Sequence, residues 1–392
     1  RKAEQALENL TVLDLTRVVA GPYAGALLGD LGANVIKIEI PGRGDDARGY
    51  GPYENGESMY YANLNRNKRG ITLNMKSEKG KEAFLKLVEK ADILIENFRP
   101  GVMDKLGLGY DRLKEINPRL IYGAVSGFGS YGPYAMRPGY DIVSQAMGGL
   151  MSVTGAKGGE PTRSGNAMGD ILGGMNLVIG VLAAVNYRQR VDISLVDSVV
   201  ASLENAYVRY FKSHELPVRN GNAYASIAPY DAYHAKDGYV IIACGNQKLY
   251  EKFCNEVVNM PWMITDERFL TVPLRVENNE IQKKYIEEWT TKYTVDEVVD
   301  IVLSHGIPAG PIYNVKQITE DHHIAEVREM FIDIDHPVIG KMTVNGCPVK
   351  LMDAMPRINR PGPTLGQHNE EIYKAIGYTD DELEEMKKEN VI

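Results

Sequence analysis

Residues 10–39 read LTVLDLTRVVAGPYAGALLGDLGANVIKIE, and this stretch sets the pattern for the first third of the chain. The apolar, β-branched runs 10–16 and 35–39 are typical of buried strands, whereas residues 23–30 between them have the composition of a helix. A strand, a helix and a second strand in succession predict a βαβ unit, in which the two strands are parallel.

The same alternation continues to residue 125. Further strands are expected at 71–73, 93–96 and 120–125, and helices at 77–90 and 113–117. Strands separated by helices imply a parallel sheet that is covered on both faces. We therefore expect an α/β fold with a Rossmann-like large domain, whose ligands bind beyond the carboxyl ends of the strands.

A smaller α+β domain is expected at residues 221–322. Strands are predicted at 233–234 and 239–243, joined by the turn 236–238, and helices follow at 247–257, 280–293 and 295–305. The large domain then comprises residues 1–220 together with the segment 323–392, which returns to it. Within the large domain, two apolar helical stretches are expected between 142 and 185 and another at 195–211; a charged helix is expected at 380–389.

The composition excludes several classes of partner. A net charge of −8 over 392 residues argues against nucleic acid, because phosphate binding needs a basic face. No apolar run reaches the roughly 18 residues that a membrane span needs. Residues 1–9 are charged and polar and contain no signal-peptide core, so we expect a cytoplasmic protein without a membrane partner.

The pattern of potential metal ligands predicts no metal site. Cys244, Cys254 and Cys347 are widely spaced and are expected to be buried thiols. The adjacent pair His322 and His323 lies in a polar stretch, and no HExxH motif is present.

Asp170 is a lone carboxylate in the segment AMGDILGGM (167–175), just before an apolar run at 177–185 that predicts a buried helix. A buried carboxylate must be hydrogen-bonded, paired or used in chemistry. Aspartate is also an ordinary residue at a helix start, so its position alone leaves both interpretations open.

Short motifs along nearly the whole chain share an order and spacing. They are VLDLTRVVAGP (12–22), LGANVIKIE (31–39), NRNKR (65–69), LNMK (73–76), ENFRPG (96–101), SGFG (126–129), GYD (139–141), GD (169–170), GIPAGP (306–311) and TLGQH (364–368). Together they resemble the class III CoA-transferases, the family of formyl-CoA transferase and of carnitine and bile-acid CoA-transferases. The resemblance implies an interlocked homodimer.

The resemblance also implies an activity. The protein would move CoA from a donor thioester, for example succinyl-CoA, to a small carboxylic acid, with coenzyme A as a substrate and no permanently bound cofactor. Asp170 would be the catalytic nucleophile and would carry an aspartyl thioester. Gly169, Gly173 and Gly174 either support the developing oxyanion through backbone N–H groups or allow close helix packing, and their spacing does not decide between these roles.

Candidate CoA contacts follow from matching positions in the family. They are Val19, Ala20, Leu73, Asn74, Met75, Lys76, Asn97, Phe98, Arg99, Lys105, Arg137, Tyr140 and Asp141. The aromatic ring of Phe98 is expected to cover adenine, and the basic side chains to meet phosphates. Tyr140 and Asp141 are expected at the pantetheine or acyl end. Ile40 stands where some family members have a basic residue, so a phosphate contact is expected to shift to Arg43 or Arg48.

Three alternatives remain at this stage. A 2-methylacyl-CoA racemase or epimerase of the same fold would place histidine where this chain has Tyr140, and tyrosine is a poor base at neutral pH. A non-catalytic CoA-binding protein would leave Asp170 unused. A Rossmann dehydrogenase is a weaker alternative, because the segment GRG (42–44) lacks the final glycine of GxGxxG.

Overall fold

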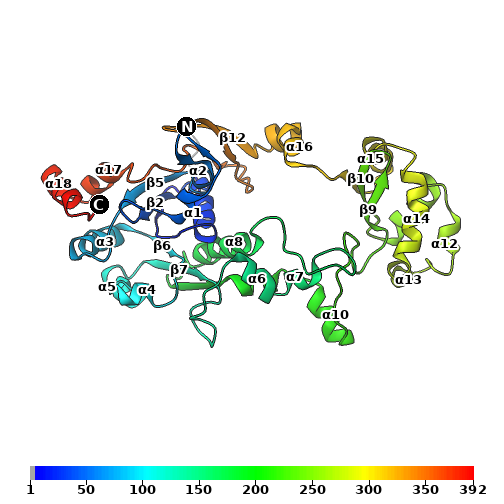
Figure 1. The fold of residues 1–392 in the computed structure, drawn as a ribbon, viewed down its shortest axis with the longest axis horizontal. Helices are drawn as coiled ribbons and strands as arrows, with labels where there is room; N and C mark the ends of the chain where they lie inside the picture. The colour runs from blue at the N-terminus through cyan, green and yellow to red at the C-terminus, as the bar shows by residue number, and fades with distance from the viewer. Residues whose placement is uncertain (1–4) are drawn as a thin grey trace. The chain divides into compact units, whose positions relative to one another are not determined.

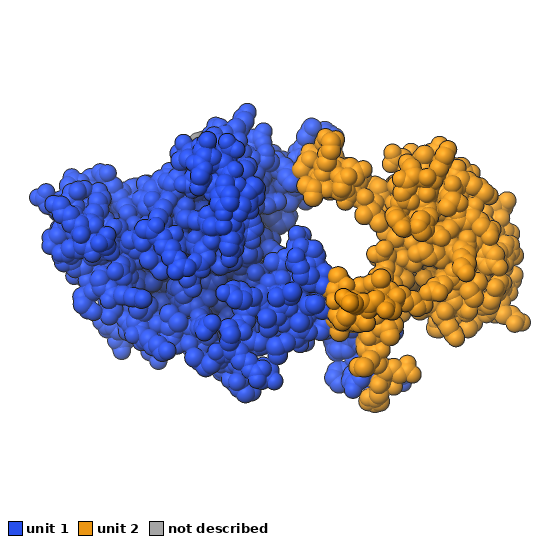
Figure 2. All heavy atoms as spheres, viewed as in Figure 1, with its two compact units in different colours: residues 1–151, 163–212, 322–392 blue, residues 152–162, 213–321 orange. Residues whose placement is uncertain are grey.

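The structure is a computed structural model that describes residues 5–392. The chain forms two compact units, which Figure 2 shows in different colours. The first comprises residues 1–151, 163–212 and 322–392, of which the structure describes all after residue 4; the second comprises 152–162 and 213–321. The segments 152–162 and 213–220, which were expected in the large domain, belong to the second unit, and residue 322, which was expected in the small domain, belongs to the first.

A six-stranded parallel sheet forms the centre of the first unit (Figure 1). Across the sheet the strands are β5 (Lys68–Thr72), β2 (Asn34–Glu39), β1 (Thr11–Asp14), β6 (Ile93–Glu96), β7 (Ile121–Ser126) and β8 (Arg190–Ser194). Counted along the chain within this sheet, the order is 3-2-1-4-5-6, which is that of doubly wound α/β folds. The predicted central parallel sheet is therefore confirmed, and its topological switch point lies between β1 and β6.

One face of the sheet is covered by helices from both ends of the chain. Leu13 of β1 and Leu94 of β6 belong to this core. The covering helices are α3 (Glu78–Lys90), α5 (Tyr110–Ile116), α17 (Asn369–Ala375) and α18 (Asp380–Lys388). Figure 1 shows α17 and α18, in red, near α3, so the C-terminal segment packs on the sheet formed by the N-terminal part.

The opposite face is covered by α1 (Ala20–Asp30) and α8 (Met168–Ala183). Val12 and Ile93, the strand neighbours of the residues on the first face, point into this core because side chains alternate along a strand. Both faces are apolar, which explains why the strands read as nearly continuous hydrophobic runs.

The remaining elements before residue 214 and after residue 327 surround the sheet or extend from it. They are the 3-10 helix Asp46–Gly49, β3 (Tyr53–Glu54), β4 (Glu57–Ser58), α2 (Met59–Leu64), α4 (Val102–Lys105), α6 (Asp141–Met147), α7 (Leu150–Val153), α9 (Leu195–Ala201), α10 (Ala206–Ser213), β12 (Phe331–His336) and β13 (Gly340–Asn345). The two helical stretches expected between 142 and 185 are three helices, because Gly148 ends α6 and Gly149 adopts a positive φ of 88°. The single stretch expected at 195–211 is divided into α9 and α10.

The second unit contains an antiparallel sheet with helices packed against it. Its strands are β9 (Tyr230–Ala235), β10 (Gly238–Ala243) and β11 (Ala309–Pro311), in the order β11-β10-β9. Its helices are α11 (Gln247–Lys252), a π-helix (Phe253–Val257), α12 (Trp262–Thr265), α13 (Val272–Glu277), α14 (Asn279–Thr290), α15 (Val295–Ser304) and α16 (Val315–Glu320), and a second π-helix (His322–Val327) follows after it. The predicted hairpin is confirmed, and β11 is an additional strand.

The states of the three cysteines and the lengths of the apolar helices complete the description of the fold. Cys244, Cys254 and Cys347 are buried free thiols, as predicted. Over the part of the chain that the structure describes, no helix is both long and apolar enough to cross a membrane.

Candidate active site

The turns that follow β1 and β6 meet at the topological switch point. Asn97 comes directly after β6, and its side-chain Oδ1 accepts the N–H of Arg17 at 2.8 Å. Its Nδ2 donates to the carbonyl of Arg17 at 2.7 Å. This pair of hydrogen bonds ties the β1–α1 turn to the end of β6. Asn97 therefore positions the turn with both of its polar side-chain atoms.

A cavity of about 740 Å³ opens beside these turns. Six of the predicted CoA contacts line it: Leu73, Asn74, Met75, Lys76, Phe98 and Arg99. Its other lining residues were not among the predicted contacts; they are Leu15, Arg17, Ile38, Glu39, Ile40, Pro41, Gly42, Gly44, Asp45, Val102, Leu106 and Asn390. We call this space the large cavity.

A second, smaller space of about 180 Å³ contains the Asp170 side of the site, and we call it the aspartate cleft. The predicted residues that line it are Val19, Ala20, Asn97, Phe98, Arg99, Arg137, Tyr140 and Asp170. Those that were not predicted are Arg17, Val18, Asp46, Pro100, Val125, Ser126, Gly127, Pro138, Gly139 and Leu195.

Arg17, Phe98 and Arg99 line both spaces, so the large cavity and the aspartate cleft adjoin. An elongated ligand can therefore extend from one space into the other. Arg17 was not predicted, although it follows the first strand directly. The rule that ligands bind beyond strand carboxyl ends would have identified it.

Asp170 lies in the first turn of α8, where the helix dipole favours a carboxylate. Burial opposes that effect, and the negative charge of Asp141 adds to the opposition. Together they raise the pKa of Asp170 to about 7. Burial and the charge of Asp141 therefore favour the protonated form of this carboxyl group.

The side chain of Asp141 binds the backbone at the start of α8. The resemblance had implied a contact at the pantetheine or acyl end of the substrate. Oδ1 of Asp141 accepts the N–H groups of Gly169 at 2.7 Å and of Asp170 at 3.2 Å, and its Oδ2 accepts Nε2 of the buried Gln145 at 2.8 Å. Asp141 lines neither the large cavity nor the aspartate cleft. It is the cap of α8, because it satisfies N–H groups that the first helical turn leaves unpaired.

The three glycines near Asp170 have packing roles. A Cβ on Gly169 would lie 2.1 Å from Ser144 Oγ, one on Gly173 would lie 2.5 Å from Leu195 Cδ2, and one on Gly174 would lie 2.5 Å from the carbonyl oxygen of Ala20. The N–H of Gly169 already donates to Asp141. The structure therefore favours close helix packing over the oxyanion role that was the other interpretation.

Among the predicted CoA contacts, Lys105 lies outside both spaces, whereas Tyr140 and Arg137 line the aspartate cleft. Lys105 is exposed at the end of α4 and lines neither space. Tyr140 lines the aspartate cleft and is 73% exposed, and the Arg137 guanidinium lies 3.6 Å from the centroid of the Tyr134 ring. Arg48, which was expected as an alternative phosphate contact, lines neither space, so that expectation is wrong.

Arg48 is held within the protein. Its Nη2 lies 2.7 Å from Oε1 of Glu39 and also donates to the carbonyl of Pro363 at 2.9 Å. Because both contacts are internal, Arg48 is not free to replace the basic residue that Ile40 lacks. Arg43 is exposed and pairs with Asp46 at 2.6 Å.

Carboxylate and guanidinium groups line the two spaces, among them those of Asp170, Arg17 and Arg99. No histidine is among the described residues that line the two spaces. Within residues 5–392, no three His, Cys, Asp or Glu side chains gather in a way that could hold a metal ion.

With this geometry in place, comparison with known proteins identifies the class. The family model for CoA-transferase family III matches residues 7–369, and the chain belongs to this family. It is therefore a CoA-transferase, and the resemblance found in its sequence is confirmed.

Individual relatives match over almost their full length. An acetyl-CoA:oxalate CoA-transferase of Acetobacter aceti is 39% identical, over 96% of this chain and 97% of the relative. The human succinyl-CoA:glutarate CoA-transferase is 36% identical, over 96% of this chain and 87% of the relative. The crystal structure of a CAIB/BAIF family protein from Brucella suis matches with a TM-score of 0.83 and 38% identity, covering 95% of this chain and 100% of the other.

Substitution of Gly174 by Ala tests the packing between α1 and α8. Alanine favours a helix by about 1 kcal/mol over glycine, but here its Cβ would meet the backbone oxygen of Ala20 at 2.5 Å. Overpacking costs about 1–3 kcal/mol, so we expect a lower urea midpoint. Gly165→Ala is the control, because its Cβ has no heavy atom within 4 Å. Equal midpoints for the two variants would contradict this packing role.

Proposed function

We propose that this enzyme transfers CoA from a donor acyl-CoA to a small carboxylic acid through a covalent intermediate on Asp170. The observation that carries the proposal is the position of the Asp170 carboxylate, in a cleft that adjoins a cavity of about 740 Å³. CoA is a long molecule with a thioester at one end and a nucleotide at the other. Coenzyme A would therefore occupy the large cavity with its nucleotide and the aspartate cleft with its thioester.

The reaction proceeds by carboxylate and thiolate attacks in turn. The ionised Asp170 attacks the thioester carbonyl of the donor, the C–S bond breaks, and a mixed anhydride and CoA thiolate result. The thiolate then attacks the aspartyl carbonyl, which releases the donor acid and leaves an aspartyl-CoA thioester. The incoming carboxylate attacks this thioester and releases the thiolate again. Attack of the thiolate on the new acyl group forms the product acyl-CoA and regenerates Asp170.

Succinyl-CoA is the donor that we propose, with a small dicarboxylic acid as acceptor. The name of the human relative pairs succinyl-CoA with glutarate, and that of the Acetobacter aceti relative has oxalate as the acid. In this chain Arg99 and Arg137 line the aspartate cleft. A guanidinium group pairs well with a carboxylate, so this lining supports a substrate that carries a second acid group.

We also propose that the enzyme is an interlocked homodimer. Helix α10 has no buried residue, and its Tyr207, Val208 and Phe211 are 48%, 50% and 71% exposed. Nearby along the chain, Leu216 is 80% exposed. Adjacent exposed apolar side chains are typical of surfaces that bind another protein chain, and a second copy of this chain is the partner that we propose.

The Asp170→Asn variant tests the mechanism. It keeps the shape of the side chain but has no nucleophilic carboxylate, so transfer is expected to fall by about three orders of magnitude or more. CoA binding should survive, because the large cavity is unchanged. Wild-type enzyme treated with donor acyl-CoA and hydroxylamine should carry a hydroxamate at residue 170, which peptide mass mapping would locate.

Asp197→Asn is the matched control, because Asp197 also lies in the first turn of a helix of the first unit, and it should retain activity. Near-normal transfer by the Asp170→Asn variant, or a hydroxamate on another carboxylate, would rule out the proposed nucleophile.

The raised pKa of Asp170 predicts how activity and stability depend on pH. Only the ionised form attacks, so kcat/KM should rise with pH up to about 7 and level off above it. Because the folded state binds the proton more tightly than the unfolded state, ionisation destabilises the fold. The melting temperature of the Asp170→Asn variant should therefore gain on that of the wild type between about pH 4 and 7 and keep a constant lead above pH 7. A pH-independent difference would contradict this prediction.

The homodimer predicts a particular response to dilution. Light scattering and sedimentation should give twice the mass of one chain, and this mass should persist at nanomolar concentration. Phe211→Arg places a charge in the exposed apolar patch and should weaken the dimer. A fully active monomer would disprove the proposal.

A further inference from the structure

The turn between β1 and α1 has an unusual backbone. Val18 adopts a positive φ of 68°, which is rare for any residue except glycine and is a clear outlier for a β-branched one. Such conformations persist only when neighbouring contacts hold them, and they are concentrated at ligand-binding sites. Arg17 and Val18 both line the aspartate cleft, so the strained turn lies at the candidate site.

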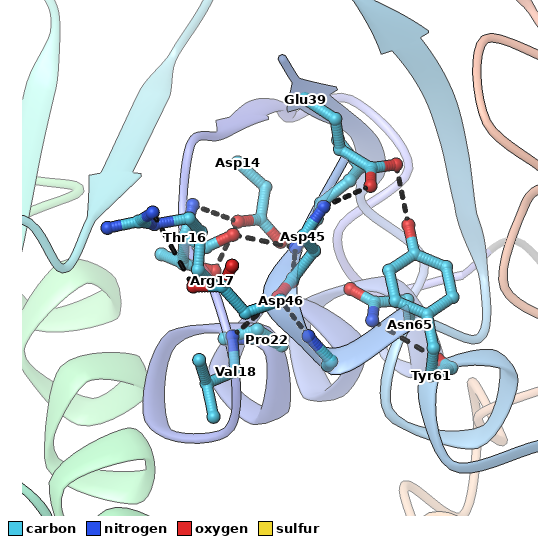
Figure 3. Close-up of polar contacts among 12 residues, drawn as sticks. Asp14, Thr16, Arg17, Val18, Pro22, Glu39, Asp45, Asp46, Tyr61 and Asn65 are labelled. Carbon is cyan, nitrogen blue, oxygen red and sulfur yellow. Dashed lines mark hydrogen bonds and ion pairs between the residues drawn. The ribbon is translucent and has the colours of Figure 1, made fainter. Parts of the chain in front are cut away.

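Side chains from other elements hold the backbone of this turn. Asn97 holds the N–H and the carbonyl of Arg17, as described above. The N–H of Val18 donates to Oδ1 of Asp45 at 3.0 Å (Figure 3), and the carbonyl of Thr16 accepts Nζ of Lys37 at 2.6 Å. Each contact comes from a residue distant in the sequence, so the turn is held by the tertiary structure.

Lys37 and Asp45 form a fully buried ion pair beneath the turn. Nζ of Lys37 lies 2.7 Å from Oδ2 of Asp45, and both side chains have 0% exposure. Burial opposes both charges. The attraction of Asp45, with that of Asp14 and Glu39, nevertheless raises the pKa of Lys37, and Lys37 together with the N–H groups of Ala47 and Val18 lowers the pKa of Asp45. A buried pair of this kind is costly to desolvate and contributes little net stability. Because Asp45 and Lys37 also bind the backbone of the turn, their contacts indicate that the pair holds the turn in position.

The side chain of Arg17 is the group that the turn presents to the ligand. Its guanidinium carbon lies 5.5 Å from the centroid of the Phe98 ring, and Nη1 lies 3.7 Å from Oδ2 of Asp46. The side chain is 40% exposed and lines both the large cavity and the aspartate cleft. A ligand that extends through both spaces passes this cation.

We propose that Asp45, supported by Lys37, is a positioning residue that holds Arg17 at the junction of the two spaces, where its guanidinium binds the pyrophosphate of the CoA thioester. The inference rests on the proposed function and names a binding residue for it. Arginine suits this task because its planar group can donate two hydrogen bonds to phosphate oxygens. The ring of Phe98 supports the guanidinium from one side.

The first test measures KM for the donor thioester and, by calorimetry, the Kd of free coenzyme A. Arg17→Ala should raise both by about tenfold or more, because a charge-assisted contact is lost, while kcat stays within about threefold of the wild-type value. Arg17→Lys should recover part of the loss. Unchanged KM and Kd in Arg17→Ala would overturn the inference.

The second test concerns Asp45. Asp45→Asn keeps an oxygen that can accept the Val18 N–H, but it removes the carboxylate that pairs directly with the buried Lys37 at 2.7 Å. KM should rise as it does in Arg17→Ala. The double variant Arg17→Ala/Asp45→Asn should be no worse than Arg17→Ala alone, because both changes act on the same contact. Additive losses would contradict a positioning role.

Asp30→Asn is the matched control for a purely structural effect. Asp30 is also buried, lies 2.6 Å from Nη2 of Arg66, and lines neither space. Both aspartate variants should melt at lower temperature, but only Asp45→Asn should raise KM and Kd. If the two variants behave alike in KM and Kd, Asp45 has no positioning role.

If Asp45→Asn does not fold, Lys37→Met/Asp45→Asn removes the Lys37 charge as well and should still raise KM and Kd, since the turn loses its contact at Thr16; unchanged values would overturn the inference. If wild-type enzyme transfers no CoA, the proposed function fails, and the Kd series with free coenzyme A still tests Arg17 by itself.

Discussion

A layer of buried charges at the carboxyl ends of β1 and β2, which the side chain of Lys68 joins from the amino end of β5, constrains the rest of the first unit. Nζ of Lys68 lies 2.6 Å from Oδ2 of Asp14, and it also donates to Asn65 Oδ1 and to the Pro22 carbonyl, both at 2.9 Å. The layer has no net charge, because the cations Lys37, Arg48 and Lys68 face the carboxylates Asp14, Glu39 and Asp45. Removing one partner of a buried pair costs about 3–5 kcal/mol. Few rearrangements of the layer are therefore possible. The β1–α1 turn, whose backbone binds Lys37 and Asp45 of the layer, is held in place as a result.

Buried polar contacts also fix the position of Asp170, the proposed nucleophile. Asp141 caps α8 through the N–H groups of Gly169 and Asp170, which fixes the position of the first turn. Its negative charge, added to burial, raises the pKa of Asp170, although the helix dipole acts in the opposite direction. The position of the carboxylate and its proton affinity thus have a common structural cause. Close packing of α8 at Gly174 against the start of α1 brings Asp170 to the cleft.

The sequence predicted the elements with strong local signals. β1, β2, β6 and β7 are apolar runs buried on both faces, and their residues were identified within a few positions. β8 was not predicted as a strand, because RVDIS is short and mostly polar. The hairpin of β12 and β13 was missed in a segment rich in proline and glycine. In each case pairing with a neighbouring strand decides the conformation, and such pairing is invisible in a local pattern.

By itself, the sequence determined the class of fold, the family and the carboxylate at position 170, because strand periodicity and motif order are local and additive along the chain. Only the tertiary structure supports the roles proposed for Arg17 and Asp45 and shows that Asp141 binds the start of α8. The sequence analysis gave Arg17 no role, and the resemblance implied that Asp141 contacts the substrate. Which groups face a cavity, and which satisfy a helix end or a strained turn, depends on contacts between residues distant in the chain. Those contacts exist only after the sheet has formed.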